Sequence, residues 1–157
     1  MFDSAVTWLV AQGRTGQWGS EPLSANPRLT ENTAGRIERG ETRVAVLDGE
    51  VVGVLSISEK PSDYVRPAGE PELFVNLLLT DRRVKGSGVG AALLEEAKAE
   101  ARRRGLPLLR VDCYRGDDEK LVDYYRGQGF TAVEPISVHQ GDDRPEWPGM
   151  LLALRLD

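Results

Sequence analysis

A short run rich in glycine and basic residues is the part of the sequence best suited to chemistry. It reads RRVKGSGVG over residues 82–90, and a helical pattern follows it directly. The start of a helix offers unpaired amides and a partial positive charge, and glycines let a ligand approach the main chain closely. Arg83 and Lys85 add positive charge beside it. The run predicts a cradle for a phosphate group, with a plain strand-to-helix turn as the alternative.

The residues after the glycines narrow the choice of phosphate ligand. A Walker A loop needs lysine followed by serine or threonine, and Ala91 and Ala92 stand there instead, which excludes a P-loop nucleotidase. Gly86, Gly88 and Ala91 do satisfy the G-x-G-x-x-A fingerprint of dinucleotide-binding proteins, and Asp112 follows at about the required distance of 20 residues. A dinucleotide ligand therefore stays open at this point.

Two blocks of the sequence resemble a known superfamily. The stretch LLLTDRRVKGSGVGAALLEEA, residues 77–97, is similar to the acetyl-CoA signature of the GNAT N-acyltransferases, whose pattern Q/R-x-x-G-x-G/A is met by Arg83, Gly86 and Gly88. The stretch YYRGQGF, residues 124–130, resembles the second block of that superfamily. Both blocks stand in the expected order, and the resemblance covers nearly the whole chain.

The resemblance implies acetyl-CoA as the cosubstrate, with pyrophosphate bound mostly by main chain and pantetheine held by the preceding strand. The residues expected to bind it are Leu77, Leu78, Leu79, Thr80, Arg83, Val84, Lys85, Gly86, Ser87, Gly88, Val89 and Gly90. The implied activity is transfer of an acetyl group to a primary amine of a small molecule or peptide, by direct attack on the thioester. A non-catalytic acyl-CoA-binding module and a dinucleotide-binding protein are the alternatives.

Two residues are candidates for catalysis by the same resemblance. Tyr125 occupies the position of the general acid, and a tyrosine of ordinary pKa, about 10, is protonated at neutral pH and can donate to the leaving sulfur. Glu72 is the first candidate for the general base, and His139 is the second. Asp117 and Asp118 occupy a region where many members have asparagine, and an ionised carboxylate cannot donate the same hydrogen bond.

The pattern of apolar residues predicts the elements that position these groups. Helices are expected over 2–12, 30–37, 89–104 and 117–128, and strands over 42–47, 50–58, 73–79, 106–114, 130–138 and 149–156. Asp48-Gly49 predicts a hairpin turn between the first two strands. The fold class predicted is α/β, an α+β mixed sheet of GNAT-like type with a strand-helix-strand crossover at its centre.

Composition restricts the classes of function. A chain of 157 residues is the size of one domain, so we expect a single domain over residues 1–157. With 20 basic and 25 acidic residues the net charge is −5, which does not favour nucleic acid or an anionic membrane. No apolar run approaches the roughly 20 residues that span a bilayer, and a cytoplasmic location is expected. Cys113 and His139 are the lone residues of their types, so neither a disulfide nor a zinc site is expected.

Three loops are expected to determine which amine is accepted. They cover residues 13–28 with Trp18, residues 60–72, and residues 138–149 with Trp147. The resemblance also leaves a homodimer open, because members of the superfamily often pair through their sheets.

Overall fold

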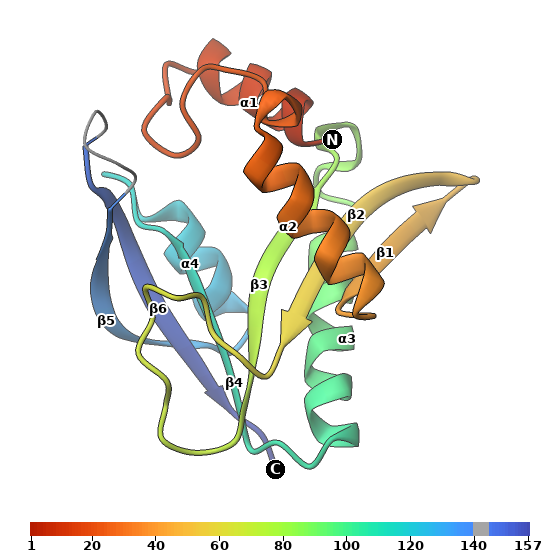
Figure 1. Ribbon diagram of the computed structural model, residues 1–157, viewed down its shortest axis with the longest axis vertical. Helices are drawn as coiled ribbons and strands as arrows, with labels where there is room; N and C mark the ends of the chain where they lie inside the picture. Colours follow the sequence, from red (N-terminus) through yellow and green to blue (C-terminus); the bar gives the residue numbers. More distant parts are fainter. Residues whose placement is uncertain (140–144) are drawn as a thin grey trace. The chain divides into compact units, whose positions relative to one another are not determined.

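The computed structural model describes residues 1–139 and 145–157 as a mixed α/β fold (Figure 1). Hydrogen bonding orders the strands β1-β2-β3-β4-β6-β5. The elements are α1 (Phe2–Ala11), η1 (Leu23–Ala25), α2 (Pro27–Glu38), β1 (Thr42–Leu47), β2 (Glu50–Ser58), β3 (Glu72–Thr80), η2 (Arg82–Val84), α3 (Val89–Arg103), β4 (Leu108–Tyr114), α4 (Lys120–Gly127), β5 (Thr131–Val138) and β6 (Trp147–Arg155). The predicted order of helices and strands is confirmed, with two short 3₁₀ helices added.

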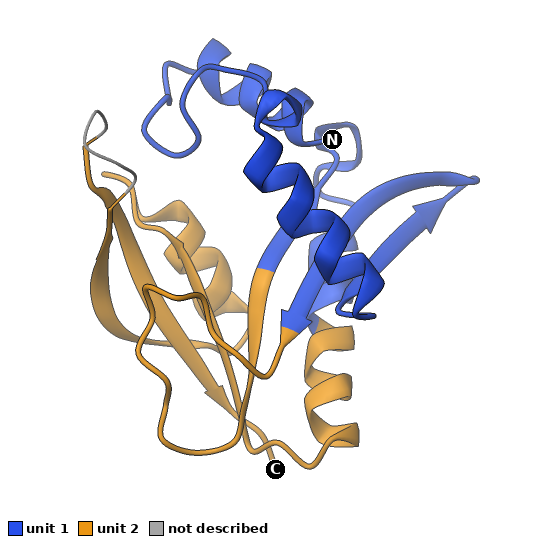
Figure 2. Ribbon diagram, viewed as in Figure 1, with its two compact units in different colours: residues 1–57, 77–94 blue, residues 58–76, 95–157 orange. Residues whose placement is uncertain are grey.

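The described chain divides into two compact units that interleave along the sequence (Figure 2). Unit 1 contains residues 1–57 and 77–94, and unit 2 contains residues 58–76 and 95–157. Both β3 and α3 contribute residues to each unit. The single domain over residues 1–157 stays a prediction.

Unit 1 begins with two helices, α1 and α2, each of which has a polar contact near its N-terminal end. The carboxylate of Asp3 in α1 accepts hydrogen bonds from the main-chain amide and the hydroxyl of Ser24, which ties α1 to η1. The α2 helix begins at Pro27 rather than at Thr30, so the predicted start was wrong. The side chain of Asn26 accepts hydrogen bonds from the first-turn amides, and proline suits the first helical position because its missing amide needs no partner.

The hairpin of unit 1 confirms the turn predicted from Asp48-Gly49. Both residues have positive φ, 51° and 80°, as a tight two-residue turn between twisted strands requires. The β1 and β2 strands pair antiparallel from Thr42 opposite Ser56 to Leu47 opposite Glu50.

Unit 2 carries the pairs that join β3 to β4, β4 to β6, and β6 to β5. The first residues of β3 pair parallel with β4, from Glu72 opposite Leu108 to Val75 opposite Val111. The β4 and β6 strands are antiparallel, as are β6 and β5. Apolar side chains on these strands form the core, and the largest that are fully buried include Phe74, Leu73, Leu109, Val111, Leu151 and Leu152. A parallel pair joined through α3 is the predicted central crossover.

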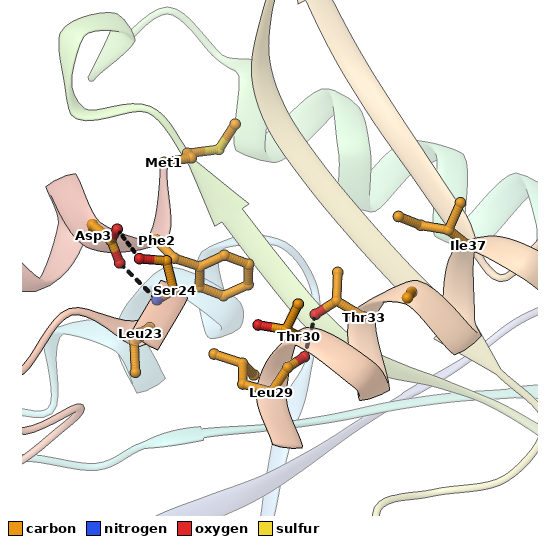
Figure 3. Close-up of a pocket in the computed structure, with 10 residues that line it drawn as sticks. Met1, Phe2, Asp3, Leu23, Ser24, Leu29, Thr30, Thr33 and Ile37 are labelled. Atoms are coloured by element: carbon orange, nitrogen blue, oxygen red, sulfur yellow. Dashed lines mark hydrogen bonds between the residues drawn. The ribbon is translucent and has the colours of Figure 1, made fainter. Parts of the chain in front are cut away.

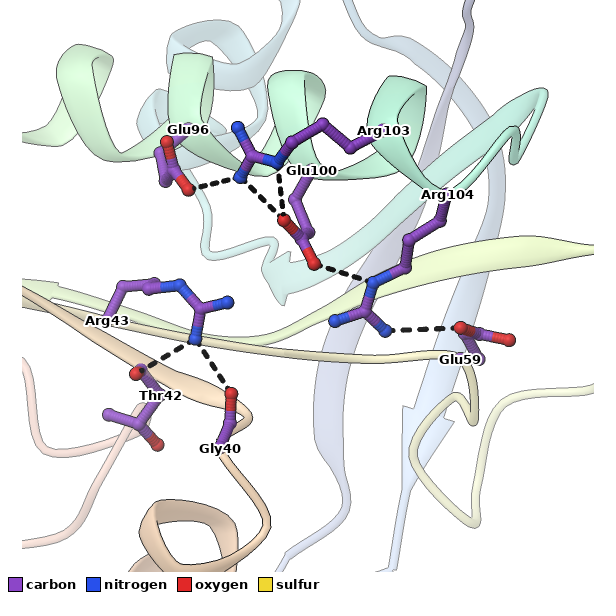
Figure 4. A network of polar contacts seen from close by, with 8 residues as sticks. All are labelled: Gly40, Thr42, Arg43, Glu59, Glu96, Glu100, Arg103 and Arg104. Atoms are coloured by element: carbon purple, nitrogen blue, oxygen red, sulfur yellow. Dashed lines mark hydrogen bonds and ion pairs between the residues drawn. The ribbon is translucent and has the colours of Figure 1, made fainter.

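The C-terminal end of α3 is held by a network of ion pairs (Figure 4). Arg103 and Arg104 both donate to the carboxylate of Glu100, and together they lower its pKa. Arg103 also reaches Glu96, and Arg104 reaches Glu59 just after β2. Because these side chains are partly exposed, each pair adds little stability. Within the described residues, no helix is both long and apolar enough to cross a membrane.

Candidate active site

The glycine loop, residues 84–90, joins η2 to α3 within unit 1. Gly86 and Gly88 have φ values of 82° and 83°, a conformation that L-residues with side chains rarely adopt. A Cβ built on either glycine would meet no protein atom within 4 Å. Glycine is therefore needed at these two positions because of their positive φ and not because a neighbouring atom excludes a side chain. The space above both glycines is open to a ligand.

The first turn of α3 presents main-chain amides next to this open space. The first helical hydrogen bond runs from the Ala92 amide to the Gly88 carbonyl, at 2.9 Å. The amides of Gly88, Val89, Gly90 and Ala91 precede that bond, so the helix itself offers them no acceptor. Amides at a helix start bind anions well, because the helix dipole adds partial positive charge. The loop and α3 together fit a pyrophosphate group.

The two cations closest to the glycines in sequence, Arg83 of η2 and Lys85 of the loop, differ in their surroundings. The guanidinium of Arg83 donates two hydrogen bonds to Asp81 Oδ2, at 2.9 and 3.1 Å, and lies 3.3 Å from Glu50. This pairing lowers the pKa of the Asp81 carboxyl. Arg83 is thus partly neutralised within the chain, although its side chain is largely exposed. Lys85 is exposed beside Gly86 and extends the positive charge of the loop into solvent.

The end of β3, Leu77–Thr80, leads directly into η2 and the loop. The described register between β3 and β4 ends at Val75, so these four residues lie beyond it. The next residue, Asp81, donates its amide to Val52 of β2 at 2.8 Å. Main chain that runs extended past the end of a strand pairing can bond to an extended ligand in the manner of an added strand. This suits a pantetheine arm.

Tyr125, the predicted general acid, lies on α4 and is buried in unit 2. Its ring packs edge-on against Phe130 and Tyr124, with centroids 5.8 and 5.4 Å away. Burial raises the pKa of Tyr125 well above its usual range, and the nearby Cys113 and Asp112 add to the effect. Its hydroxyl therefore stays protonated at neutral pH, as a proton donor requires.

Glu72, the predicted base, has a partner that sequence reasoning missed. It is buried, and its carboxylate accepts two hydrogen bonds from the guanidinium of Arg110, at 2.5 and 2.8 Å. The amide of Ala68 donates to the same carboxylate at 3.1 Å, and Arg110 also donates to the carbonyl of Arg66. A bidentate buried ion pair of this kind is typical of a structural contact. The base role of Glu72 stays a prediction, and these contacts weigh against it.

Asp112 is a second carboxylate of unit 2 that is partly withdrawn from water. It lies on β4 and accepts a 2.9 Å hydrogen bond from the hydroxyl of Tyr64, which comes from the loop after β2. Burial raises the pKa of Asp112 to about 6, although the Tyr64 hydrogen bond opposes the shift. The available signal in the sequence was an acid that stands, with Arg110, inside the mainly apolar strand pattern LPLLRVDCY. From the sequence alone, Asp112 was a candidate only as a ribose ligand for a dinucleotide.

The remaining candidates are placed as follows. Cys113 is buried, and burial raises the pKa of its thiol to about 12, as expected of a packed side chain. His139 is exposed at the end of β5. Asp118 accepts a hydrogen bond from the Lys120 amide at the start of α4, while Asp117 is exposed. The part of the third variable loop at residues 140–144 lies outside the described residues.

A hollow of about 400 Å³ lies among α1, η1 and α2 of unit 1 (Figure 3). Its lining is mainly apolar, with Phe2, Leu29 and Ile37 among the contributing side chains. The one carboxylate that lines it, Asp3, already accepts two hydrogen bonds from Ser24. The hollow therefore suits an apolar group better than a phosphate.

Known proteins share both the sequence pattern and the fold. The chain is 29% identical over 131 residues to an uncharacterized N-acetyltransferase, YesJ, of Bacillus subtilis (strain 168), a match that covers 76% of this chain and 72% of the relative. The crystal structure of a ribosomal-protein-alanine N-acetyltransferase from Brucella melitensis superposes with a TM-score of 0.66 at 18% identity, covering 99% of this chain and 97% of the other. The structure of yncA from Salmonella typhimurium with its cofactor acetyl-CoA superposes with a TM-score of 0.63 at 18% identity. This match covers 98% of this chain and 86% of the other.

These likenesses confirm the predicted GNAT-like fold with its central β3-α3-β4 crossover. Residues 5–130 match the acetyltransferase (GNAT) family. This range includes the glycine loop and Tyr125. The match favours acetyl-CoA over a dinucleotide as the cosubstrate. The chain therefore belongs to the acetyltransferase (GNAT) family, as an enzyme whose cosubstrate is acetyl-CoA.

Proposed function

We propose that the chain transfers an acetyl group from acetyl-CoA to the primary amine of a small molecule or peptide, without a covalent acyl-enzyme. The observation that carries the proposal is the pair of glycines at positive φ, with open space above them, directly before the first-turn amides of α3, for which the helix itself offers no acceptor. This is a surface built from main chain for a multiply charged anion. The pyrophosphate of acetyl-CoA is such an anion.

The proposed roles of the chain's residues follow from their positions. The residues proposed to hold acetyl-CoA are Leu77, Leu78, Leu79 and Thr80 for the pantetheine arm, and Arg83, Val84, Lys85, Gly86, Ser87, Gly88, Val89 and Gly90 for the pyrophosphate. Acetyl-CoA supplies a thioester that an amine can attack. Tyr125 holds a proton at neutral pH and is proposed to deliver it to the departing sulfur.

The acceptor class rests on the reaction type rather than on a bound ligand. A relative in fold carries the name ribosomal-protein-alanine N-acetyltransferase, so a peptide with N-terminal alanine is a reasonable first acceptor to test. The chain's net charge of −5 favours cationic acceptors in general, because opposite charges raise the rate of encounter.

Calorimetric titration of the purified protein with acetyl-CoA and with NAD tests the cosubstrate. We expect acetyl-CoA to bind and NAD not to bind. Gly86→Ala should weaken acetyl-CoA binding about 10-fold or more, because a Cβ strains the loop and enters the space reserved for the ligand. Thiol release from acetyl-CoA, measured with the alanine peptide and a panel of amines, then tests transfer.

Gly40→Ala is the matched control for the loop variant. Gly40 also has positive φ and open space where a Cβ would lie, but it follows the end of α2. Both variants should lose similar stability, about 1 kcal/mol, while Gly40→Ala keeps its affinity for acetyl-CoA. Equal affinities in the two variants would remove the glycine loop from the proposed site.

A further inference from the structure

Asp112 and Tyr64 form a polar pair on one face of unit 2. The hydroxyl of Tyr64 donates to Asp112 Oδ2 at 2.9 Å across 48 positions of sequence. Asp112 is half-buried, whereas the side chain of Tyr64 is 47% exposed. The carboxylate is thus partly withdrawn from water but close to the surface, where a ligand could reach it.

An aromatic wall stands next to this pair. Tyr114 lies two residues beyond Asp112 on β4 and so on the same face, about 7 Å along the strand. Its ring packs against Trp147 of β6 with centroids 5.5 Å apart. The indole also covers Gly149, where a Cβ would lie only 2.8 Å from Trp147 and from Ile136. Close packing over a glycine holds the wall in a fixed position.

Among the residues that the structure describes, no cation forms an ion pair with Asp112. Arg110 lies two residues earlier on the same face, but its guanidinium is bound to Glu72 and to the carbonyl of Arg66. From the loop after β2, Tyr64 faces Asp112 as a hydrogen-bond donor, and Leu151 is directly opposite on β6. On the strand's other side, the titratable neighbours are the thiol of Cys113 and the hydroxyl of Tyr125 on α4.

We propose that Asp112 is the acceptor-side carboxylate of this acetyltransferase, binding the ammonium group of a cationic amine and taking its proton, with Tyr64 as its positioning residue. The Tyr114–Trp147 pair would contact the part of the acceptor next to that ammonium, since aromatic faces attract cations and apolar groups alike. This inference rests on the proposed function, because it identifies the acceptor site of the same reaction.

The proton transfers balance as follows. One proton passes from the ammonium nitrogen to an Asp112 oxygen, which leaves the nitrogen with a lone pair. That lone pair forms the bond to the acetyl carbon, the carbon–sulfur bond breaks, and the sulfur leaves with the electron pair of that bond. The nitrogen then releases its second proton to solvent, which gives the neutral amide. Under the proposed function the sulfur takes a proton from Tyr125. Solvent removes the proton from Asp112 and returns one to Tyr125.

The titration of Asp112 agrees with this role. Burial raises its pKa to about 6, so it is ionised at neutral pH yet more basic than an ordinary aspartate. The Tyr64 hydrogen bond favours the ionised form. Loss of that bond should therefore raise the pKa of Asp112 further.

The test measures both binding and the pH profile. The amine probes are phenethylamine, spermidine and a peptide with N-terminal alanine, each titrated into the wild type and Asp112→Asn at pH 7.5. We expect at least one probe to bind the wild type and to bind Asp112→Asn about 10- to 100-fold more weakly, because a charged hydrogen bond is lost. Affinity for acetyl-CoA should be unchanged in the same variant.

The profile of kcat/KM against pH, measured with the probe that binds, separates catalysis from structure. The wild type should show an acidic limb near pH 6, Asp112→Asn should lack it, and Tyr64→Phe should move it to higher pH. Asp63→Asn is the control, because Asp63 is an exposed carboxylate next to Tyr64 that pairs only with Lys60 among the contacts described. It should leave the profile unchanged.

Three outcomes would overturn the inference: no probe binds the wild type, Asp112→Asn binds as well as the wild type, or the acidic limb survives in Asp112→Asn. Failure of the proposed function looks different, because acetyl-CoA itself then fails to bind the wild type. A wild type that binds acetyl-CoA but none of the amines contradicts the Asp112 site alone.

Discussion

The guanidinium of Arg82 lies over the ring of Trp8, with its central carbon 3.7 Å from the ring centroid. Arg82 begins η2, immediately before the glycine loop, and Trp8 belongs to α1. Within the described residues, the buried Nε of Arg82 has no hydrogen-bond partner, so the aromatic face is a main contact of this cation. The contact connects the N-terminal helix of unit 1 to the segment that leads into the glycine loop.

Trp8→Leu should therefore weaken both the fold and the loop. We expect a loss of about 1–3 kcal/mol in the free energy of unfolding, from the cation–π contact and the lost aromatic surface, together with a severalfold weaker affinity for acetyl-CoA. Urea unfolding and calorimetry measure the two effects. Trp18→Leu is the control, because Trp18 packs on Phe2 instead, and its affinity for acetyl-CoA should not change.

Glu72→Gln distinguishes a structural role from the predicted base role. Because Arg110 would keep its charge in a buried site without a carboxylate, we expect a loss of about 3–5 kcal/mol in the free energy of unfolding. The double variant Glu72→Leu with Arg110→Met should recover much of that loss, since no buried charge then remains unpaired. Should Glu72→Gln instead fold as stably as the wild type and lose only turnover, the base role would be supported.

Tyr125→Phe tests the proposed proton donor. Removing the hydroxyl should lower kcat by about 100-fold or more, the contribution typical of general acid catalysis, while affinity for acetyl-CoA stays the same. Tyr124→Phe is the matched control on the same helix, and it should retain turnover. Because burial raises the pKa of Tyr125 far above neutrality, wild-type turnover should show no loss from its ionisation up to about pH 9. Full activity in Tyr125→Phe would require another donor.

The stability of Asp112→Asn should depend on pH in a defined direction. The pKa of Asp112 is about 6 in the folded chain against an ordinary value of 3.8, so the folded form binds its proton more tightly. The contribution of the protonated Asp112 to the free energy of unfolding is therefore fully present below about pH 4. It decreases as the pH rises toward about 6 and is absent at higher pH. Asn cannot ionise, so the variant should gain stability relative to the wild type between about pH 4 and pH 7.5, by at most about 3 kcal/mol.

Urea unfolding of both proteins at pH 4 and pH 7.5 measures this change. The other carboxylates titrate alike in the two proteins, so the difference between them isolates Asp112. A difference that stays constant across this range would mean that the carboxyl is not withdrawn from water in the folded chain.

Features that depend on neighbouring residues were predictable from the sequence. Asp48-Gly49 specifies its own turn, and the spacing of Arg83, Gly86 and Gly88 identifies the loop before α3. The first and last residues of the helices were predicted less accurately, even where the deciding residues are close in sequence. The α4 helix begins at Lys120 rather than at Asp117, because Glu119 takes a left-handed conformation that stops the helix from starting earlier.

Contacts across strands could not be predicted in the same way. Glu72 and Arg110 are 38 positions apart, and their pairing depends on the register of β3 against β4, which no single strand's pattern contains. Tyr64 meets Asp112 only because the loop after β2 runs back to β4. The glycine loop could therefore be located from the sequence, whereas the carboxylate proposed here to face the acceptor could not.

The packing of Trp147 and Ile136 over Gly149 has a consequence for comparing related chains. Any side chain at position 149 would collide with both neighbours. Relatives that carry alanine or a larger residue there should have smaller residues at 147 or 136, and they should differ in the amines they accept. Covariation among these three positions would then sort members of the family by acceptor before any assay is run.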